Sequence, residues 1–96
     1  VPEPVKLTAL RLMQAEAGRT PPEAAHDAAA ALIGYCMLGR EQFIASTGPA
    51  EADRVEARLD AAIAEGEGLD ARLVLLTLHA GVIAPEVADR FEVETG

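Results

Sequence analysis

The sequence is poor in cysteine and in aromatic side chains. Its 96 residues include one cysteine, Cys36, and no tryptophan, and aromatic residues make up 3%. A lone cysteine cannot form a disulfide within the chain, which excludes a disulfide-stapled fold and favours a reducing, cytoplasmic setting. With so few rings the core must be aliphatic and small, and the abundance of alanine, the strongest helix former, predicts an all-α protein.

Basic side chains are also scarce. Lysine and arginine together number 8 against 16 acidic residues, which gives a formal net charge of −8. An acidic surface repels phosphate groups, so the composition disfavours nucleic acids and anionic membranes as partners and is compatible with a protein partner. No apolar run has the roughly 18 residues that a membrane-spanning helix needs. The strong preference for arginine over lysine is suggestive of a bacterial protein.

Glycine and proline divide the chain into helical segments. The opening VPEP predicts a linker-like extension over residues 1–3, and a single helical domain is expected over residues 4–96. We predict an irregular bundle of four main helices plus a short C-terminal fifth helix. The main helices are expected at 4–17, 21–38, 49–65 and 70–80, the fifth follows Gly81, and residues 40–46 add one or two helical turns.

Two helix starts carry capping signals. Thr20, Pro21 and Glu23 fit an N-cap, a first helical position and the distal residue of a capping box. Asp70 fits the N-cap of the fourth main helix. The first half of the helix after Thr20 is nearly all alanine, and such small side chains allow another helix to approach closely.

Residues 73–90 form a helix, a glycine turn and a second helix, which raises the alternative of a helix-turn-helix regulator. The second helix should then present basic or amide side chains to DNA. It offers Glu86, Asp89, Glu92 and Glu94 with only one basic residue, Arg90. A helical corner within a bundle is therefore the favoured interpretation.

The remaining chemical motifs are sparse. Glu23 and His26 form a Glu-x-x-His pattern, which could contribute to a carboxylate and histidine metal site if a dimer duplicated it. Cys36 with His26 or His79 is the only combination for nucleophilic catalysis, and Cys36 lies in an apolar run where cysteine behaves as a small hydrophobic residue. His26 beside Asp27 is expected to be solvated, and His79 to lie near a helix C-terminus. We expect no catalytic residue, no resident metal and no cofactor.

Helices 21–38 and 70–80 are apolar around much of their circumference, so we expect the monomer to leave apolar surface uncovered. A second copy of the chain would cover it, since two-fold dimers are the commonest oligomers. Aromatic residues and methionine are enriched at interfaces. The predicted interface consists of Tyr35, Met37, Leu38, Phe43 and Ile44, and the alternative is that these residues close the core of the bundle.

The sequence therefore predicts a non-catalytic, acidic protein–protein interaction module that associates with itself. An adaptor, an inhibitor and a regulatory domain all fit this description. The helix-turn-helix regulator and the dimer-assembled metal protein remain as alternatives.

Overall fold

Short, glycine-rich connections separate the helices of the computed structural model, which describes the backbone of residues 2–95 and the side chains of residues 2–90. This part of the chain contains no strand, so the all-α prediction is confirmed. The helices are α1 (Glu3–Ala17), α2 (Glu23–Leu38), α3 (Arg40–Thr47), α4 (Pro49–Glu65), α5 (Leu69–His79) and α6 (Pro85–Thr95).

The number and lengths of the helices differ from the prediction. Residues 40–47 form a complete helix of 8 residues, and the C-terminal helix α6 has 11 residues, as many as α5. The sequence pattern understated α3 because it buries only one side chain, Phe43. A helix with so narrow an apolar face has no clear helical periodicity.

The predicted capping interactions are absent. Helix α2 begins at Glu23, with extended Pro22 as the N-cap residue and no side-chain capping bond, so the expected box from Thr20 does not form. Pro22 also explains why the helix cannot begin at Pro21, because a residue that precedes proline is driven out of the helical region. Helix α5 begins at Leu69 after Gly68, and the Asp70 carboxylate bonds the Arg58 guanidinium instead of capping the helix.

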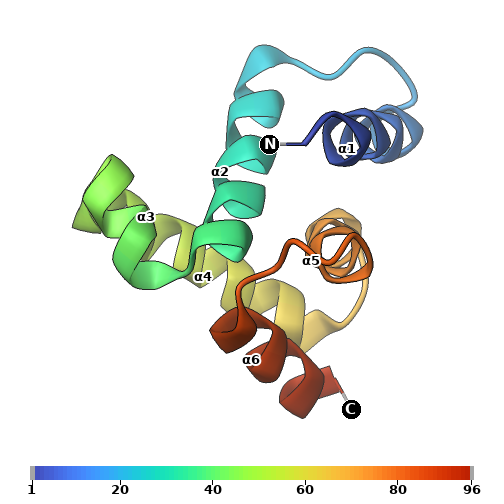
Figure 1. Cartoon of the computed structure of the whole chain (residues 1–96). Helices are drawn as coiled ribbons and strands as arrows, with labels where there is room; N and C mark the ends of the chain where they lie inside the picture. Colours follow the sequence, from blue (N-terminus) through green and yellow to red (C-terminus); the bar gives the residue numbers. More distant parts are fainter. Residues whose placement is uncertain (1, 96) are drawn as a thin grey trace.

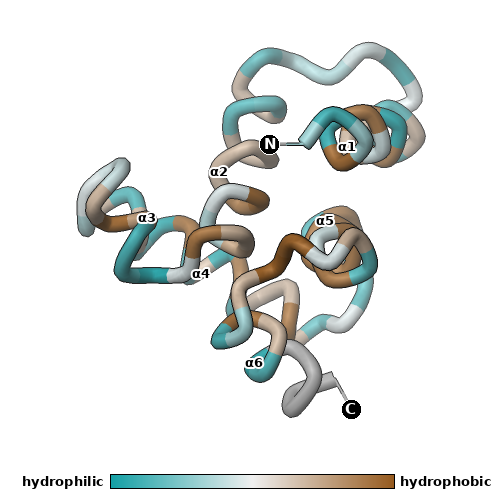
Figure 2. The backbone as a smooth tube through the Cα atoms, viewed as in Figure 1, coloured by the Kyte–Doolittle hydropathy of each residue, from teal (hydrophilic) through white to brown (hydrophobic). Residues whose placement is uncertain are grey.

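Helix α5 lies at the centre of the fold and packs against α1, α2 and α4 (Figure 1). Its Leu73, Val74 and Thr77 are completely buried. The Thr77 hydroxyl donates a 2.7 Å hydrogen bond to the Val74 carbonyl, which satisfies the one polar side chain in this set. Figure 2 colours most of α5 and the segment after it as hydrophobic. The apolar pattern predicted a helix buried on every side, and this is wrong for one face: Arg72 is exposed, and Leu75 and Leu76 are half-buried.

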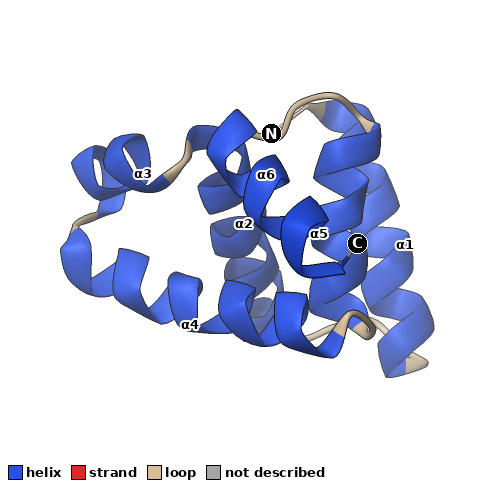
Figure 3. Ribbon diagram, turned by 90° about the horizontal axis from the view of Figure 1, so that it is seen from below, coloured by secondary structure: helices blue, strands red, loops and turns tan. Residues whose placement is uncertain are grey.

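Helices α1 and α3 lie at opposite sides of the molecule in both ribbon views (Figures 1 and 3), with α2 between them. Helix α4 packs against α2, α3, α5 and α6. The Ala84 amide donates a 2.7 Å hydrogen bond to the Cys36 carbonyl, which joins the segment before α6 to the last turn of α2.

Large apolar side chains are rarely exposed outright. Leu7 and Leu38, with 47% and 40% of their surface exposed, are the exposed large hydrophobic residues among those whose side chains are described. Further apolar residues are half-buried, among them Met37, Ile44, Leu75 and Leu76. Coverage of this surface by a second copy of the chain stays a prediction.

Candidate functional site

A groove of about 360 Å³ lies between α1 and the first half of α2. Both helices pack against α5, but they make little direct contact with each other. The α1 stripe of Val5, Ala9 and Met13 is buried, and alanines form most of the facing wall of α2. The residues that line the groove are Lys6, Ala9, Leu10, Met13, His26, Asp27, Ala29, Ala30 and Ile33.

Three polar side chains reach this groove from two helices. Lys6 stands on the α1 wall and Asp27 on the α2 wall, and both are exposed. His26 is half-buried, and its Nε2 atom is buried without a hydrogen-bond partner. The expectation that His26 is solvated beside Asp27 is therefore wrong for this ring nitrogen.

The Glu23 and His26 pair does not form a metal centre on its own. Glu23 is the first residue of α2 and is exposed, whereas His26 lies one turn further along, in the groove. Among the side chains that the structure describes, no group of three or more histidine, cysteine, aspartate or glutamate residues is placed to hold a metal ion.

Cys36 is separated chemically from both histidines. Its side chain is completely buried in α2, and burial raises the pKa of the thiol to about 12. A thiol with such a pKa is protonated at neutral pH and is a poor nucleophile. His79 ends α5 and is exposed. No hydrogen bond joins Cys36 to His26 or His79 in the described part of the chain.

The corner between α2 and α3 contains the only aromatic pair within residues 2–90. The rings of Tyr35 and Phe43 pack edge to face, with their centroids 5.4 Å apart and an interplanar angle of 62°. Each side chain is only 3% exposed. Two of the five predicted interface residues are therefore core residues, which corrects their assignment to a free surface. They close the bundle, as the alternative interpretation held.

The other three predicted interface residues lie at the same corner. Met37 and Leu38 end α2, and Ile44 lies in α3. Leu38 is exposed, while Met37 and Ile44 are half-buried and pack against the core. We call Met37, Leu38 and Ile44 the corner patch.

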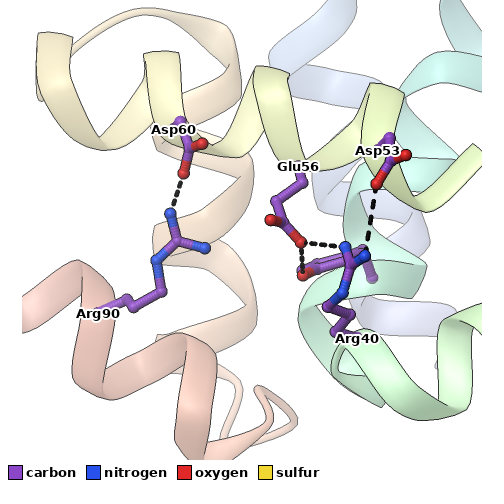
Figure 4. Close-up of polar contacts among 6 residues, drawn as sticks. Arg40, Asp53, Glu56, Asp60 and Arg90 are labelled. Atoms are coloured by element: carbon purple, nitrogen blue, oxygen red, sulfur yellow. Dashed lines mark hydrogen bonds and ion pairs between the residues drawn. The ribbon is translucent and has the colours of Figure 1, made fainter.

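A polar network holds this corner against α4 (Figure 4). The Tyr35 hydroxyl donates a 2.7 Å hydrogen bond to Glu56 Oε2, and Arg40 Nη1 donates a 2.6 Å bond to the same oxygen. Arg40 Nη2 also bonds Asp53 Oδ1 at 3.4 Å. Burial, together with the neighbouring Glu56 carboxylate, raises the pKa of Tyr35 to about 12. The hydrogen bond from Tyr35 and the pairing with Arg40 lower the pKa of Glu56.

A second arginine binds the same face of α4 (Figure 4). Arg90 of α6 pairs with Asp60, one turn beyond Glu56. The two arginines, Arg40 and Arg90, thus attach α3 and α6 to one acidic row on α4. This acidic row was not predicted from the sequence. The available signal was the spacing of Asp53, Glu56 and Asp60 by three and four residues, which places three acids on one helix face.

Helices α5 and α6 occupy the positions of the suspected helix-turn-helix, but their packing differs from that motif. Helix α6 packs mainly against α4 rather than α5. Its one basic side chain, Arg90, is engaged by Asp60. Buried Val87 anchors the helix, and the side chain of Phe91, four residues later in the sequence, lies outside the described residues.

Comparison with protein-family models, with curated proteins and with solved structures finds no match to this chain. Within the described residues, no helix has the length and apolar character that crossing a membrane requires.

Proposed function

We propose that this chain is a non-catalytic, acidic protein–protein interaction module that associates with a second copy of itself through the corner patch. The observation that carries the proposal is the exposure of Leu38 beside two further apolar residues at one corner of the fold. A large apolar side chain that is 40% exposed gains most from a partner that covers it.

The surroundings of the corner patch resemble the anatomy of protein interfaces. Such interfaces have an apolar centre and a polar rim, and arginine is enriched in them. Here Arg40 follows Leu38 after a single glycine, and Glu56 and Asp53 hold its guanidinium. The buried Tyr35–Phe43 pair forms a rigid base for the patch, so association would order few additional side chains.

Two properties of Cys36, the chain's only thiol, support a non-catalytic role. Its side chain is buried, and its raised pKa keeps the thiol protonated at neutral pH. The packing of α6 on α4 and its exposed acids support a protein partner over DNA. With three apolar residues at its centre the contact is small, and we expect a dimer dissociation constant on the order of 10 µM or weaker.

Light scattering coupled to size exclusion, over a wide range of protein concentrations, tests the proposal. The wild-type chain should shift from monomer to dimer as its concentration rises. Leu38→Lys should weaken the dimer about tenfold or more, because it places a charge at the apolar centre. Leu7→Lys is the matched control, since Leu7 is similarly exposed but lies on α1, at the opposite side of the molecule.

The two leucine variants separate the possible outcomes. Loss of the dimer in Leu38→Lys alone supports the corner patch. Loss in Leu7→Lys alone moves the interface to α1 and contradicts the corner patch. A wild-type chain that stays monomeric at every concentration contradicts self-association altogether.

A further inference from the structure

The groove between α1 and α2 is distinct from the corner patch, because it involves the first half of α2 and the side of the molecule opposite α3. Its volume of about 360 Å³ lies within the usual range for small-molecule pockets. Ala9, Met13, Ala29 and Ile33 give it a buried apolar floor. Such a floor suits an aliphatic group.

The two charges at the groove have opposite signs and stand on opposite walls. Lys6 comes from α1 and Asp27 from α2. No ion pair joins these two side chains, both of which belong to the described residues. The formal charge of the groove lining is therefore zero in a chain of net charge −8. A simple anion would face Asp27 and a simple cation would face Lys6, whereas a zwitterion can satisfy both.

The His26 ring also lines the groove. Its Nε2 atom is buried, so this atom is not open to an occupant of the groove, and the charged contacts come from Lys6 and Asp27.

From these features we infer that the groove binds a free α-amino acid with an aliphatic or thioether side chain, such as leucine or methionine. The ammonium group faces Asp27, the carboxylate faces Lys6, and the side chain lies on the floor formed by Ala9, Met13, Ala29 and Ile33. The inference does not depend on self-association, because it uses none of the corner-patch residues.

Heteronuclear NMR titration of the full chain with L-leucine tests this inference. A ligand of this size in an open groove is expected to bind with a dissociation constant on the order of 1 mM. The amide shifts should be confined to the helical turns that line the groove. Isocaproate, which lacks the ammonium group, and isoamylamine, which lacks the carboxylate, should each bind at least about tenfold more weakly.

Two pairs of variants sharpen the test. Ala30→Leu fills the groove and should abolish binding, while Ala57→Leu makes the same change at an exposed position of α4 and should leave binding unchanged. Lys6→Met and Asp27→Asn should each weaken leucine binding about tenfold, with the spectrum of the free protein changed only near the substituted residue. Absence of groove-confined shifts with leucine and methionine overturns the inference. Equal binding of isoamylamine or isocaproate overturns the zwitterion assignment.

Discussion

Tyr35 is the residue whose ionisation is most closely tied to the fold. Its pKa is raised from 10.0 to about 12 by burial and by the Glu56 carboxylate. A raised folded-state pKa stabilises the fold fully below the unfolded pKa, and this contribution is lost as the pH rises from about 10 to 12. The Tyr35–Glu56 contact is therefore an alkali-sensitive point of the structure.

The ionisation of Tyr35 can be measured directly, because it is the only tyrosine and the chain has no tryptophan. Ultraviolet absorbance should show a tyrosinate midpoint near 12 rather than 10. In Glu56→Gln the midpoint should fall part of the way towards 10, because the largest cause, burial, remains. A wild-type midpoint at 10 would contradict the buried, hydrogen-bonded hydroxyl.

Asp70 shows why some contacts of single residues could not be predicted from the sequence. Asp70 has the right type and position for an N-cap, yet its carboxylate accepts bonds of 3.1 and 2.7 Å from Arg58. The two residues are 12 positions apart, and nothing in a helix-start pattern identifies a partner so distant. Cys36 is buried, as predicted, because an apolar run within a helix is itself a signal that its residues lie in the core.

Two substitutions compare the capping bond predicted for Thr20 with the ion pair observed for Asp70. Thr20→Ala should change the free energy of unfolding by less than about 0.5 kcal/mol, since the expected capping bond does not form. Asp70→Ala should cost about 1 kcal/mol, because it removes a bidentate, partly buried pair with Arg58. Urea denaturation measures both changes in the free energy of unfolding. A larger cost for Thr20→Ala than for Asp70→Ala would support the predicted capping box.

At the scale of the element, the α2–α3 connection is the most constrained turn. Gly39 has a φ of 83° and a ψ of 170°, a region open to glycine alone. A Cβ atom at this position would also collide with the Glu86 carboxylate at the start of α6. The sequence predicted a helix end at Gly39, but only the fold reveals that α6 comes close to it.

Gly39→Ala should therefore destabilise the protein by about 2 kcal/mol, mainly through backbone strain, because the exposed Glu86 side chain can turn away from the added methyl group. Gly18→Ala is the matched control. Gly18 ends α1 in the left-handed helical region with open space around it, so its substitution should cost only about 1 kcal/mol. Equal costs in thermal or urea denaturation would contradict the greater backbone strain at Gly39.

At the scale of the whole molecule, composition predicted the class of the fold but not its surface. Alanine content and glycine punctuation were sufficient for an all-α chain, and the apolar run over residues 70–80 was sufficient for the central position of α5 but not for its exposed face. The groove was not predicted, because the alanines of α2 indicate close helix packing, whereas α1 packs on α5 and leaves a hollow beside them. The packing of all the helices together determines which helix approaches the alanine face of α2. A local sequence pattern cannot predict it.

Net charge sets the expected salt response of the whole molecule. Two copies that each carry a formal charge of −8 repel one another. Raising the ionic strength from about 0.05 to 0.5 M shortens the screening length and should strengthen the proposed dimer several-fold. Binding to duplex DNA would weaken over the same range. Light scattering and a DNA titration across one salt series distinguish the two, and a dimer that weakens with salt would contradict an apolar interface.

The central position of α5 has a consequence for synthesis on the ribosome. Its residues 69–79 follow α1, α2 and α4 in the sequence, and all three helices pack against it. While the nascent chain ends before residue 69, α1 has no surface on which to bury Val5, Ala9 and Met13. The core therefore forms only after residue 79 has left the ribosome, and until then these apolar side chains are exposed to chaperones.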